Sequence, residues 1–362
     1  MLSTALKFST ALTRQTRVST TQRPSVLGAL LSTNANQHNA TDKIGFVGLG
    51  NMGLPMCLNL ITNHTVDHTS PNGSTETVIA YDLNPDAVAK AAAGGATPAS
   101  DLKDIADCSI IITSLPSCAA VENVLGALLE SIPANSPQHI TSNTLPRIFI
   151  DTSTVNPLLS RSLFDDAFKN GHILVDAPVS GGVKGAEDGT LTFMVGSDSN
   201  TETYDRISPY LRRMGKRVIG CGGPGTGSAA KLCNNLALAS QMIGVCEAIN
   251  LGEELGVDPI VLADVMNSST AKCWSSEVCN PHPSVATARG PGKMPASKEY
   301  EGGFSTKLML KDVGLAVAAA DELGVVLPLG SASKQLYQLA DISGMGSKDF
   351  GVMLQYLRGK KV

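Results

Sequence analysis

The sequence lacks the features that would favour nucleic acid or a membrane as a partner. Only 17% of its 362 residues are charged, and the formal net charge is -4 with a pI near 5.9. Without a global positive field, any anion has to be bound locally. The longest apolar run in the body of the chain, around Ala316 to Ala320, is far shorter than the roughly 20 residues that span a bilayer. We therefore expect a soluble protein with neither nucleic acid nor membrane as a partner.

The cysteines lack the spacing of a metal site or a disulfide framework. Eight of them are scattered along the chain, without a CxxC pair and without a histidine at zinc-ligand spacing. Free thiols in a reducing compartment are the simplest interpretation. His64 and His68 lie four residues apart in a polar stretch, but no third ligand accompanies them. We expect no metal.

The first forty or so residues lack acidic side chains. No Asp or Glu precedes Asp42, and many Ser and Thr surround the basic residues Lys7, Arg14, Arg17 and Arg23. This composition is typical of a mitochondrial transit peptide, and a merely disordered tail is the alternative. We expect residues 1–42 to be a leader that directs the protein to the mitochondrial matrix.

From Lys43 onward, short apolar segments alternate with amphipathic ones, which predicts βαβ units and a parallel sheet. The expected strands are Ile44–Val47, Val78–Tyr81, Ser109–Thr113, Ile148–Ile150 and Ile173–Val175. The expected helices are Met52–Ile61, Pro85–Ala93, Ala119–Ser131 and Leu158–Asn170. The pattern predicts an α/β fold that begins with a Rossmann-type doubly wound sheet, in a domain over residues 43–224.

After Gly227 the pattern is helical and contains no further strand signal. The expected helices are Ser228–Leu255, Pro259–Asn267, Ser305–Leu323 and Leu329–Ala340. The segment from Asn280 to Gly303 is rich in Pro and Gly, and we expect it to be a loop near the domain junction. The sequence thus predicts an all-helical C-terminal domain over residues 225–362, which binds the substrate and forms oligomers.

A glycine-rich turn follows the first expected strand and opens the first helix. Its GxGxxG pattern, Gly48, Gly50 and Gly53, permits a tight turn, close approach of a pyrophosphate and close packing of helix on strand. In this context we expect a dinucleotide site. Its expected contacts in the turn are Gly48, Leu49, Gly50, Asn51, Met52 and Gly53.

Asp82 follows the second expected strand, where a carboxylate can bond both ribose hydroxyls of the adenosine and repel a 2'-phosphate. No Arg or Lys follows it before Lys90, so we expect NAD in preference to NADP. An aspartate that only caps a turn is the alternative.

Two further stretches carry candidate chemistry. Ser180, Gly181 and Gly182 present unshielded backbone N–H groups that suit a carboxylate, although a flexible turn is an equally simple interpretation. Lys231 and Asn235 lie one turn apart on a helix face that is otherwise small and apolar. A lysine buried on such a face has a lowered pKa that suits proton transfer, whereas most helical lysines are solvated.

The chain resembles one known family over residues 44–358. The stretches that carry the resemblance are IGFVGLGNMGLPM, LPS at Leu115–Ser117, DTST at Asp151–Thr154, DAPVSGG, LTFMVG, KLCNN, CWSS at Cys273–Ser276 and GGFSTKLMLKD at Gly302–Asp312. In this order they are similar to the 3-hydroxyisobutyrate dehydrogenases of the β-hydroxyacid dehydrogenase superfamily. The resemblance implies a Rossmann domain joined by a long helix to a helical domain, homodimers or homotetramers, and NAD-dependent oxidation of (S)-3-hydroxyisobutyrate to methylmalonate semialdehyde in valine breakdown.

The resemblance also implies roles for single residues. Lys231 matches the catalytic lysine, which acts as general acid/base. The matched substrate contacts are Ser180, Gly181, Gly182, Asn235, Trp274 and Asp312, and the matched cofactor contacts are Leu115, Pro116, Thr154 and Lys311. The chain departs from the pattern at Ala120, at Cys279 and in the longer, more basic segment Pro281 to Tyr300.

Two rival functions remain open. A relative that acts on another small hydroxy acid or semialdehyde, of the tartronate semialdehyde reductase type, would share the scaffold. A non-enzymatic NAD-binding module would be expected to lack the lysine at position 231 and to carry a basic segment before the Rossmann domain. Lys231 is present and no such basic DNA-binding segment is, which favours the enzyme.

Overall fold

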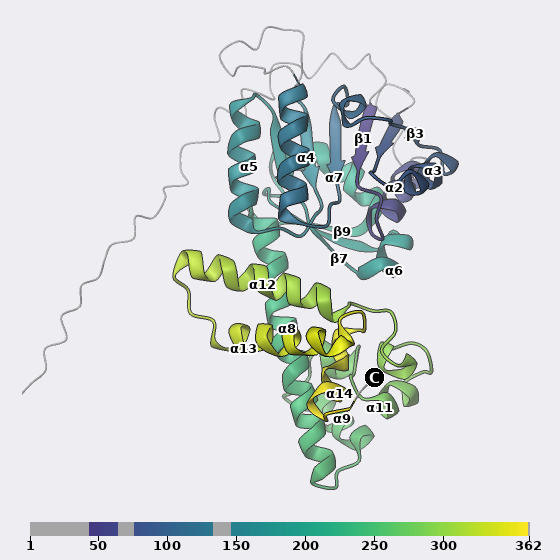
Figure 1. The fold of residues 1–362 in the computed structure, drawn as a ribbon, viewed down its shortest axis with the longest axis vertical. Coiled ribbons are helices and arrows are strands. Elements are labelled where there is room, and N and C mark those ends of the chain that lie inside the picture. Colours follow the sequence, from purple (N-terminus) through teal and green to yellow (C-terminus); the bar gives the residue numbers. More distant parts are fainter. Residues whose placement is uncertain (1–42, 64–75, 133–145, 361–362) are drawn as a thin grey trace, which may run out of the picture.

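The computed structural model describes residues 43–63, 76–132 and 146–360, which form two lobes joined by one long helix. Figure 1 shows the sheet-containing lobe above the helical lobe, with α8 (Thr226–Glu254) running from the first into the second. The expected transit peptide and the His64 and His68 pair lie outside the described residues.

The upper lobe is built on a six-stranded parallel sheet in the order β3-β2-β1-β4-β5-β6. Its strands are β1 (Lys43–Val47), β2 (Thr77–Tyr81), β3 (Thr97–Pro98), β4 (Ile110–Thr113), β5 (Ile148–Asp151) and β6 (Ile173–Asp176). This order is that of a doubly wound sheet, so the predicted fold class is confirmed. The strand order reverses between β1 and β4, where such sheets bind their ligands.

Alternate side chains of the strands fill two separate cores, one on each face of the sheet. Phe46 and Ile112 pack with α2 (Gly53–Thr62) on one face, and Ile111 packs with α4 (Cys118–Ser131) on the other. The remaining flanking elements are α3 (Pro85–Ala93), η2 (Leu102–Ile105) and α5 (Pro157–Lys169).

Residues 177–220 form a second, small sheet that the sequence analysis missed. It has the order β7-β8-β9, with β7 antiparallel and β9 parallel to β8. Its elements are β7 (Val179–Ser180), α6 (Gly182–Glu187), β8 (Leu191–Val195), α7 (Glu202–Met214) and β9 (Gly215–Gly220). The strand β7 is only two residues long and has no readable periodic signal, whereas α7 is clearly amphipathic in spite of Pro209, so its pattern was available in the sequence.

In the described residues of the lower lobe, helices joined by turns are the regular secondary structure, apart from one isolated β-bridge between Ser305 and Asp349. Its helices besides α8 are α9 (Pro259–Ser268), α10 (Trp274–Glu277), α11 (Pro283–Ala288), η3 (Pro295–Lys298), α12 (Thr306–Leu323), α13 (Pro328–Ala340), η4 (Asp341–Met345), η5 (Phe350–Val352) and α14 (Met353–Leu357). The core places α8 residues such as Met242 against Val313 of α12 and Tyr337 of α13. The predicted helical fold of the C-terminal part is therefore confirmed.

Helix α8 is long and apolar enough to cross a membrane by length and composition alone. It also buries Lys231 and Asn235, and it contributes Met242 and Ile249 to the core of the lower lobe. Helix α8 also packs against α12, α13 and α14. Because its buried polar groups lie among protein partners, α8 is the central helix of a folded domain.

The segment Asn280 to Gly303 differs from its prediction as a loop near the domain junction. It contains α11 and η3, and it lies against the end of α8 that is far from the sheet (Figure 1). There His282 Nε2 lies 3.1 Å from Oε1 of Glu253, which is near the end of α8. The prolines at 283 and 295 begin short helices, a position that proline favours, so they do not mark an irregular loop.

Candidate active site

The glycine-rich turn between β1 and α2 has the geometry that a dinucleotide needs. Gly48 has a φ of +94°, and a Cβ there would lie 2.3 Å from the Ser114 carbonyl oxygen. A Cβ on Gly53 would lie 1.9 Å from the Gly48 carbonyl oxygen, so helix and strand pack too closely for a side chain. Gly50 is exposed, and a Cβ there would meet no protein atom within 4 Å. The open space at Gly50 fits a pyrophosphate brought close to the backbone.

Asp82 holds this turn in place from the end of β2. Its Oδ2 accepts a hydrogen bond from the Leu49 backbone N–H at 2.5 Å, and its Oδ1 accepts one from the Asn84 N–H at 2.8 Å. The turn-capping alternative is therefore observed, and the ribose contact stays a prediction. Leu49 itself is buried at 3% exposure, so its side chain belongs to the core.

A buried carboxylate orders the neighbouring loops after β4 and β5. Asp151 accepts hydrogen bonds from the hydroxyls of Thr113 at 2.7 Å and Ser153 at 2.6 Å. The Ser153 hydroxyl in turn accepts the Leu115 N–H at 2.8 Å. Burial raises the pKa of Asp151, and the hydroxyl donors oppose that rise. The network fixes the backbone beside Leu115 and Thr154, two of the predicted cofactor contacts.

The predicted carboxylate loop lies at the edge of the small sheet. Ser180 ends β7, Gly181 has a φ of +141° and Gly182 has a φ of +65°. L side chains rarely adopt these two conformations, which explains the glycines. A Cβ on Gly182 would meet no protein atom within 4 Å, so there is room for a ligand at its backbone.

Lys231 is positioned by the close contact between α8 and the sheet-containing lobe. A Cβ on Gly227 would lie 2.1 Å from the Met194 carbonyl oxygen, so the helix backbone packs directly on β8. The buried Asp176 carboxylate accepts the N–H groups of Gly225 at 2.8 Å and Ser228 at 2.7 Å, which satisfies the first turn of α8. No local sequence pattern marks this cap. Lys231 follows one turn later.

The Lys231 side chain has the environment that suits a proton-transfer group. It is only 7% exposed, and burial lowers its pKa, while Asp312 opposes that change and Lys311 adds to it. A lysine with a lowered pKa can exist in the neutral form that accepts a proton. The expectation of a desolvated lysine on this helix face is therefore confirmed, and its catalytic role stays a prediction.

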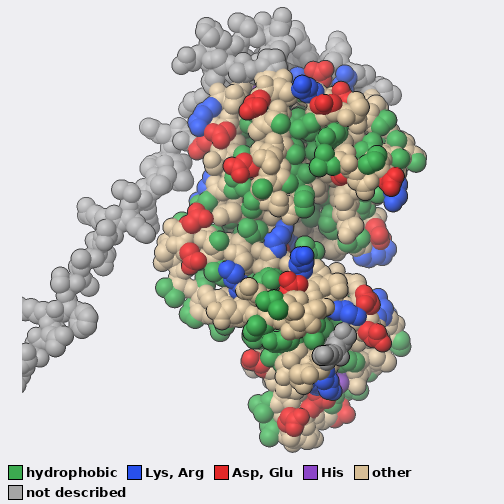
Figure 2. Space-filling view, viewed as in Figure 1, with side chains coloured by type: hydrophobic (Ala, Val, Ile, Leu, Met, Phe, Trp, Pro, Cys, Tyr) green, Lys and Arg blue, Asp and Glu red, His purple; other side chains and the backbone are tan. Residues whose placement is uncertain are grey.

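Asn235, one turn beyond Lys231, is held by a residue from α12. Its Nδ2 donates to Asp312 Oδ2 at 2.6 Å, and both side chains are about 3% exposed. Lys311 Nζ lies 3.8 Å from Asp312 Oδ1 and donates to the Thr154 carbonyl oxygen at 3.3 Å. The structure thus brings α8, α12 and the loop after β5 together where the lobes meet. Figure 2 shows Lys and Arg side chains along this boundary.

The structure also describes the surroundings of Trp274, a predicted substrate contact, and of Ala120 and Cys279, where the chain departs from the family pattern. Trp274 in α10 is 46% exposed and stacks on Phe350 with ring centres 6.4 Å apart, so its role as a pocket wall stays a prediction. Ala120 lies in the first turn of α4, where its N–H donates to Ser117 Oγ at 3.2 Å. Cys279 is buried, and burial raises the pKa of its thiol.

Two family models match the chain, one on each side of the lobe junction. The NAD binding domain of 6-phosphogluconate dehydrogenase matches residues 43–223, and the NAD-binding region of NADP-dependent 3-hydroxyisobutyrate dehydrogenase matches residues 225–357. The mitochondrial 3-hydroxyisobutyrate dehydrogenase of Drosophila melanogaster is 42% identical, over 88% of this chain and 90% of its own length. The chain belongs to the 3-hydroxyisobutyrate dehydrogenase family.

Other members of the family agree with this assignment. The mitochondrial enzyme of Homo sapiens is 40% identical, over 87% of this chain and 86% of its own length. The structure of the Mycobacterium tuberculosis 3-hydroxyisobutyrate dehydrogenase with L-serine is 36% identical with a TM-score of 0.76, and the match covers 88% of this chain and all of that one. The chain is an NAD-dependent oxidoreductase of a hydroxyacid dehydrogenase family, and the mitochondrial names of its relatives support a mitochondrial location.

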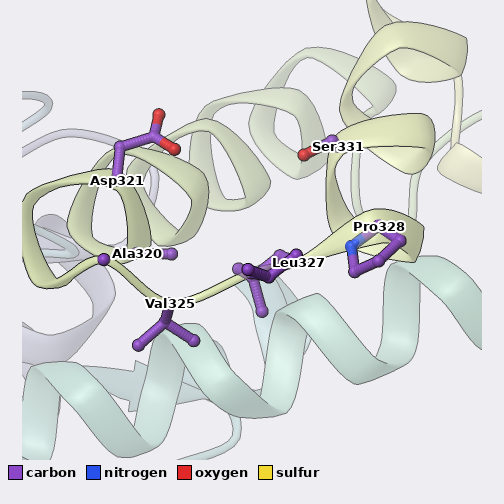
Figure 3. A pocket seen from close by; sticks show the side chains of 8 residues that line it. Ala320, Asp321, Val325, Leu327, Pro328 and Ser331 are labelled. Carbon is purple, nitrogen blue, oxygen red and sulfur yellow. The ribbon is translucent and has the colours of Figure 1, made fainter. Parts of the chain in front are cut away.

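One surface hollow lies away from the candidate residues. A hollow of about 420 Å³ lies at the turn between α12 and α13, where Asp321, Val325 and Ser331 are among its lining residues (Figure 3). In residues 43–63, 76–132 and 146–360, no group of three His, Cys, Asp or Glu side chains is placed to hold a metal ion.

Proposed function

We propose that the chain oxidises (S)-3-hydroxyisobutyrate to methylmalonate semialdehyde with NAD, and that Lys231 is the general acid/base. The observation that carries the proposal is the buried Lys231 amine, whose pKa burial lowers, one helical turn from an asparagine that Asp312 holds. Relatives named for this activity cover most of the chain at about 40% identity, which supports the substrate.

The residues divide the work between binding and proton transfer. The backbone N–H groups at Ser180, Gly181 and Gly182 would hold the substrate carboxylate and so fix the distance of the alcohol carbon from the cofactor. Asn235 uses one amide hydrogen for Asp312, and its second amide hydrogen would orient the substrate. Lys231 would accept the hydroxyl proton during oxidation and return it in the reverse reaction.

When bound, NAD supplies the acceptor for the hydride that leaves the alcohol carbon. The turn residues Gly48 to Gly53 would hold its pyrophosphate, and Asp82 its adenosine ribose, which favours NAD over NADP. Leu115 and Pro116 would contact it from the loop after β4, Thr154 from the loop after β5, and Lys311 from α12. Asp312 would act on the substrate through Asn235, whose side-chain amide it holds by a hydrogen bond.

We further propose a leader at 1–42, a cofactor domain at 43–224 and a helical substrate and oligomerisation domain at 225–362. Residues 43–223 and 225–357 match separate NAD-binding models, which supports this division. A homodimer or homotetramer in the mitochondrial matrix completes the proposal. N-terminal sequencing of the protein from mitochondria should find the chain beginning near residue 40.

One assay separates the proposed substrate from its rivals. The purified mature chain is given NAD or NADP with 3-hydroxyisobutyrate, L-serine, glycerate or 4-hydroxybutyrate, and dinucleotide reduction is followed by absorbance. We expect the highest kcat/KM with 3-hydroxyisobutyrate and NAD. A higher value with glycerate would favour the tartronate semialdehyde reductase type, and no reduction with any of them would favour a non-enzymatic role.

A further inference from the structure

A single side chain of α2 reaches the end of α6. Asn59 lies in the second half of α2, and its Nδ2 donates to the Ala186 carbonyl oxygen at 2.6 Å and approaches the Glu187 carbonyl oxygen at 3.3 Å. These carbonyls belong to the last two residues of α6, and such terminal carbonyls have no partner within their own helix. Asn59 therefore supplies a donor that the end of α6 lacks.

The two helices that Asn59 joins begin at the two halves of the candidate site. Helix α2 starts at Gly53 in the dinucleotide turn, and α6 starts at Gly182 in the carboxylate loop. Figure 1 shows both on the same side of the upper lobe. Because α6 is only six residues long, a shift of its end would be passed on to its beginning. The hydrogen bond thus lies between the cofactor turn and the carboxylate loop.

Asn63, the C-cap residue of α2, offers a matched comparison. It lies four residues beyond Asn59, and its Nδ2 donates to the Arg213 carbonyl oxygen at 2.8 Å. Arg213 is near the end of α7, which leads into β9 and not into the carboxylate loop. The two asparagines therefore use the same chemistry on different neighbours.

We propose that Asn59 is a positioning residue that holds the backbone N–H groups of the carboxylate loop at a set distance from the dinucleotide turn. The inference rests on the proposed role of Ser180 to Gly182 in substrate binding. Asn59 touches neither the substrate nor the cofactor. Its loss weakens substrate binding while leaving the cofactor turn and Lys231 in place.

The test compares Asn59→Ala and Asn59→Asp with Asn63→Ala in the full enzyme. Aspartate keeps the shape of asparagine but cannot donate, so both Asn59 variants should raise the KM for the hydroxy acid about threefold to tenfold, the effect of one hydrogen bond. We expect kcat and the affinity for NAD to stay within about twofold, and Asn63→Ala to leave KM within about twofold. Thermal melts of all variants show whether each is folded.

The outcomes separate the two proposals. A KM rise in Gly182→Ala, whose Cβ would occupy the open space at that backbone, but not in the Asn59 variants would overturn the role of Asn59 alone. Unchanged KM in all of them would overturn the carboxylate loop as well. Equal KM rises in Asn59→Ala and Asn63→Ala would mean that loss of any α2 contact has this effect, and would also overturn the inference.

Discussion

Asp349 should make the stability of the enzyme fall as the pH rises through the mildly acidic range. The carboxyl is 2% exposed, and it accepts the N–H groups of Phe304 and Gly351, each at 2.9 Å. Burial raises its pKa from 3.8 to about 6, and the two N–H donors only partly oppose this. The folded state therefore binds the proton more tightly than the unfolded state does.

The sign and size follow from linkage between protonation and folding. A raised pKa contributes stability that is fully present below about pH 3.8 and is lost as the pH rises through about 6. The difference of roughly two pH units corresponds to about 3 kcal/mol in the free energy of unfolding. Other buried acids contribute in the wild type and in the variant alike, so a comparison of the two isolates Asp349.

The assay is urea unfolding of wild type and Asp349→Asn at intervals between about pH 4 and pH 7.5. Because asparagine does not ionise, the stability of the variant relative to wild type should increase by up to about 3 kcal/mol across this range. A difference between the two proteins that does not change with pH would refute the reasoning. So would one that changes in the opposite direction.

Three further predictions concern the site. Gly50→Ala should melt within about 2 °C of wild type, because its Cβ meets no protein atom, yet it should bind NAD at least about tenfold more weakly in a fluorescence titration. Asp82→Ala should weaken NAD binding more than NADP binding, and better wild-type turnover with NADP would contradict that preference. Asp312→Asn removes a charge that raises the pKa of Lys231, so the acidic limb of the kcat profile should move to lower pH. An unmoved limb would exclude this coupling.

The sequence predicted the parts of the fold that have a strong periodic pattern. The five strands predicted for the first domain appear in the sheet within a residue of their expected bounds, and α3 matches its prediction at both ends. The glycine turn and the lysine helix were also predictable, because each combines a local pattern with a defined structural context.

The missed features depend on contacts between distant segments. The strand β7 pairs with only two residues of β8, and such a short pairing leaves no alternating pattern to read. The cap that Asp176 forms on α8 joins residues 49 and 52 positions apart in the chain. The Asn235 and Asp312 pair spans 77 positions. Nothing local marks these partners, although the resemblance to a family did single out Asn235 and Asp312.

The role of Lys231 is tested most directly by steady-state kinetics of Lys231→Arg with saturating NAD and substrate, beside an NAD titration. Arginine keeps the positive charge but does not give up a proton near neutrality. If Lys231 transfers the proton, kcat should fall on the order of 10²-fold or more while NAD still binds. If it only anchors the carboxylate, KM should rise and kcat should remain. A Lys231→Arg enzyme with kcat within about threefold of wild type would contradict the account and point to Lys311 as the base.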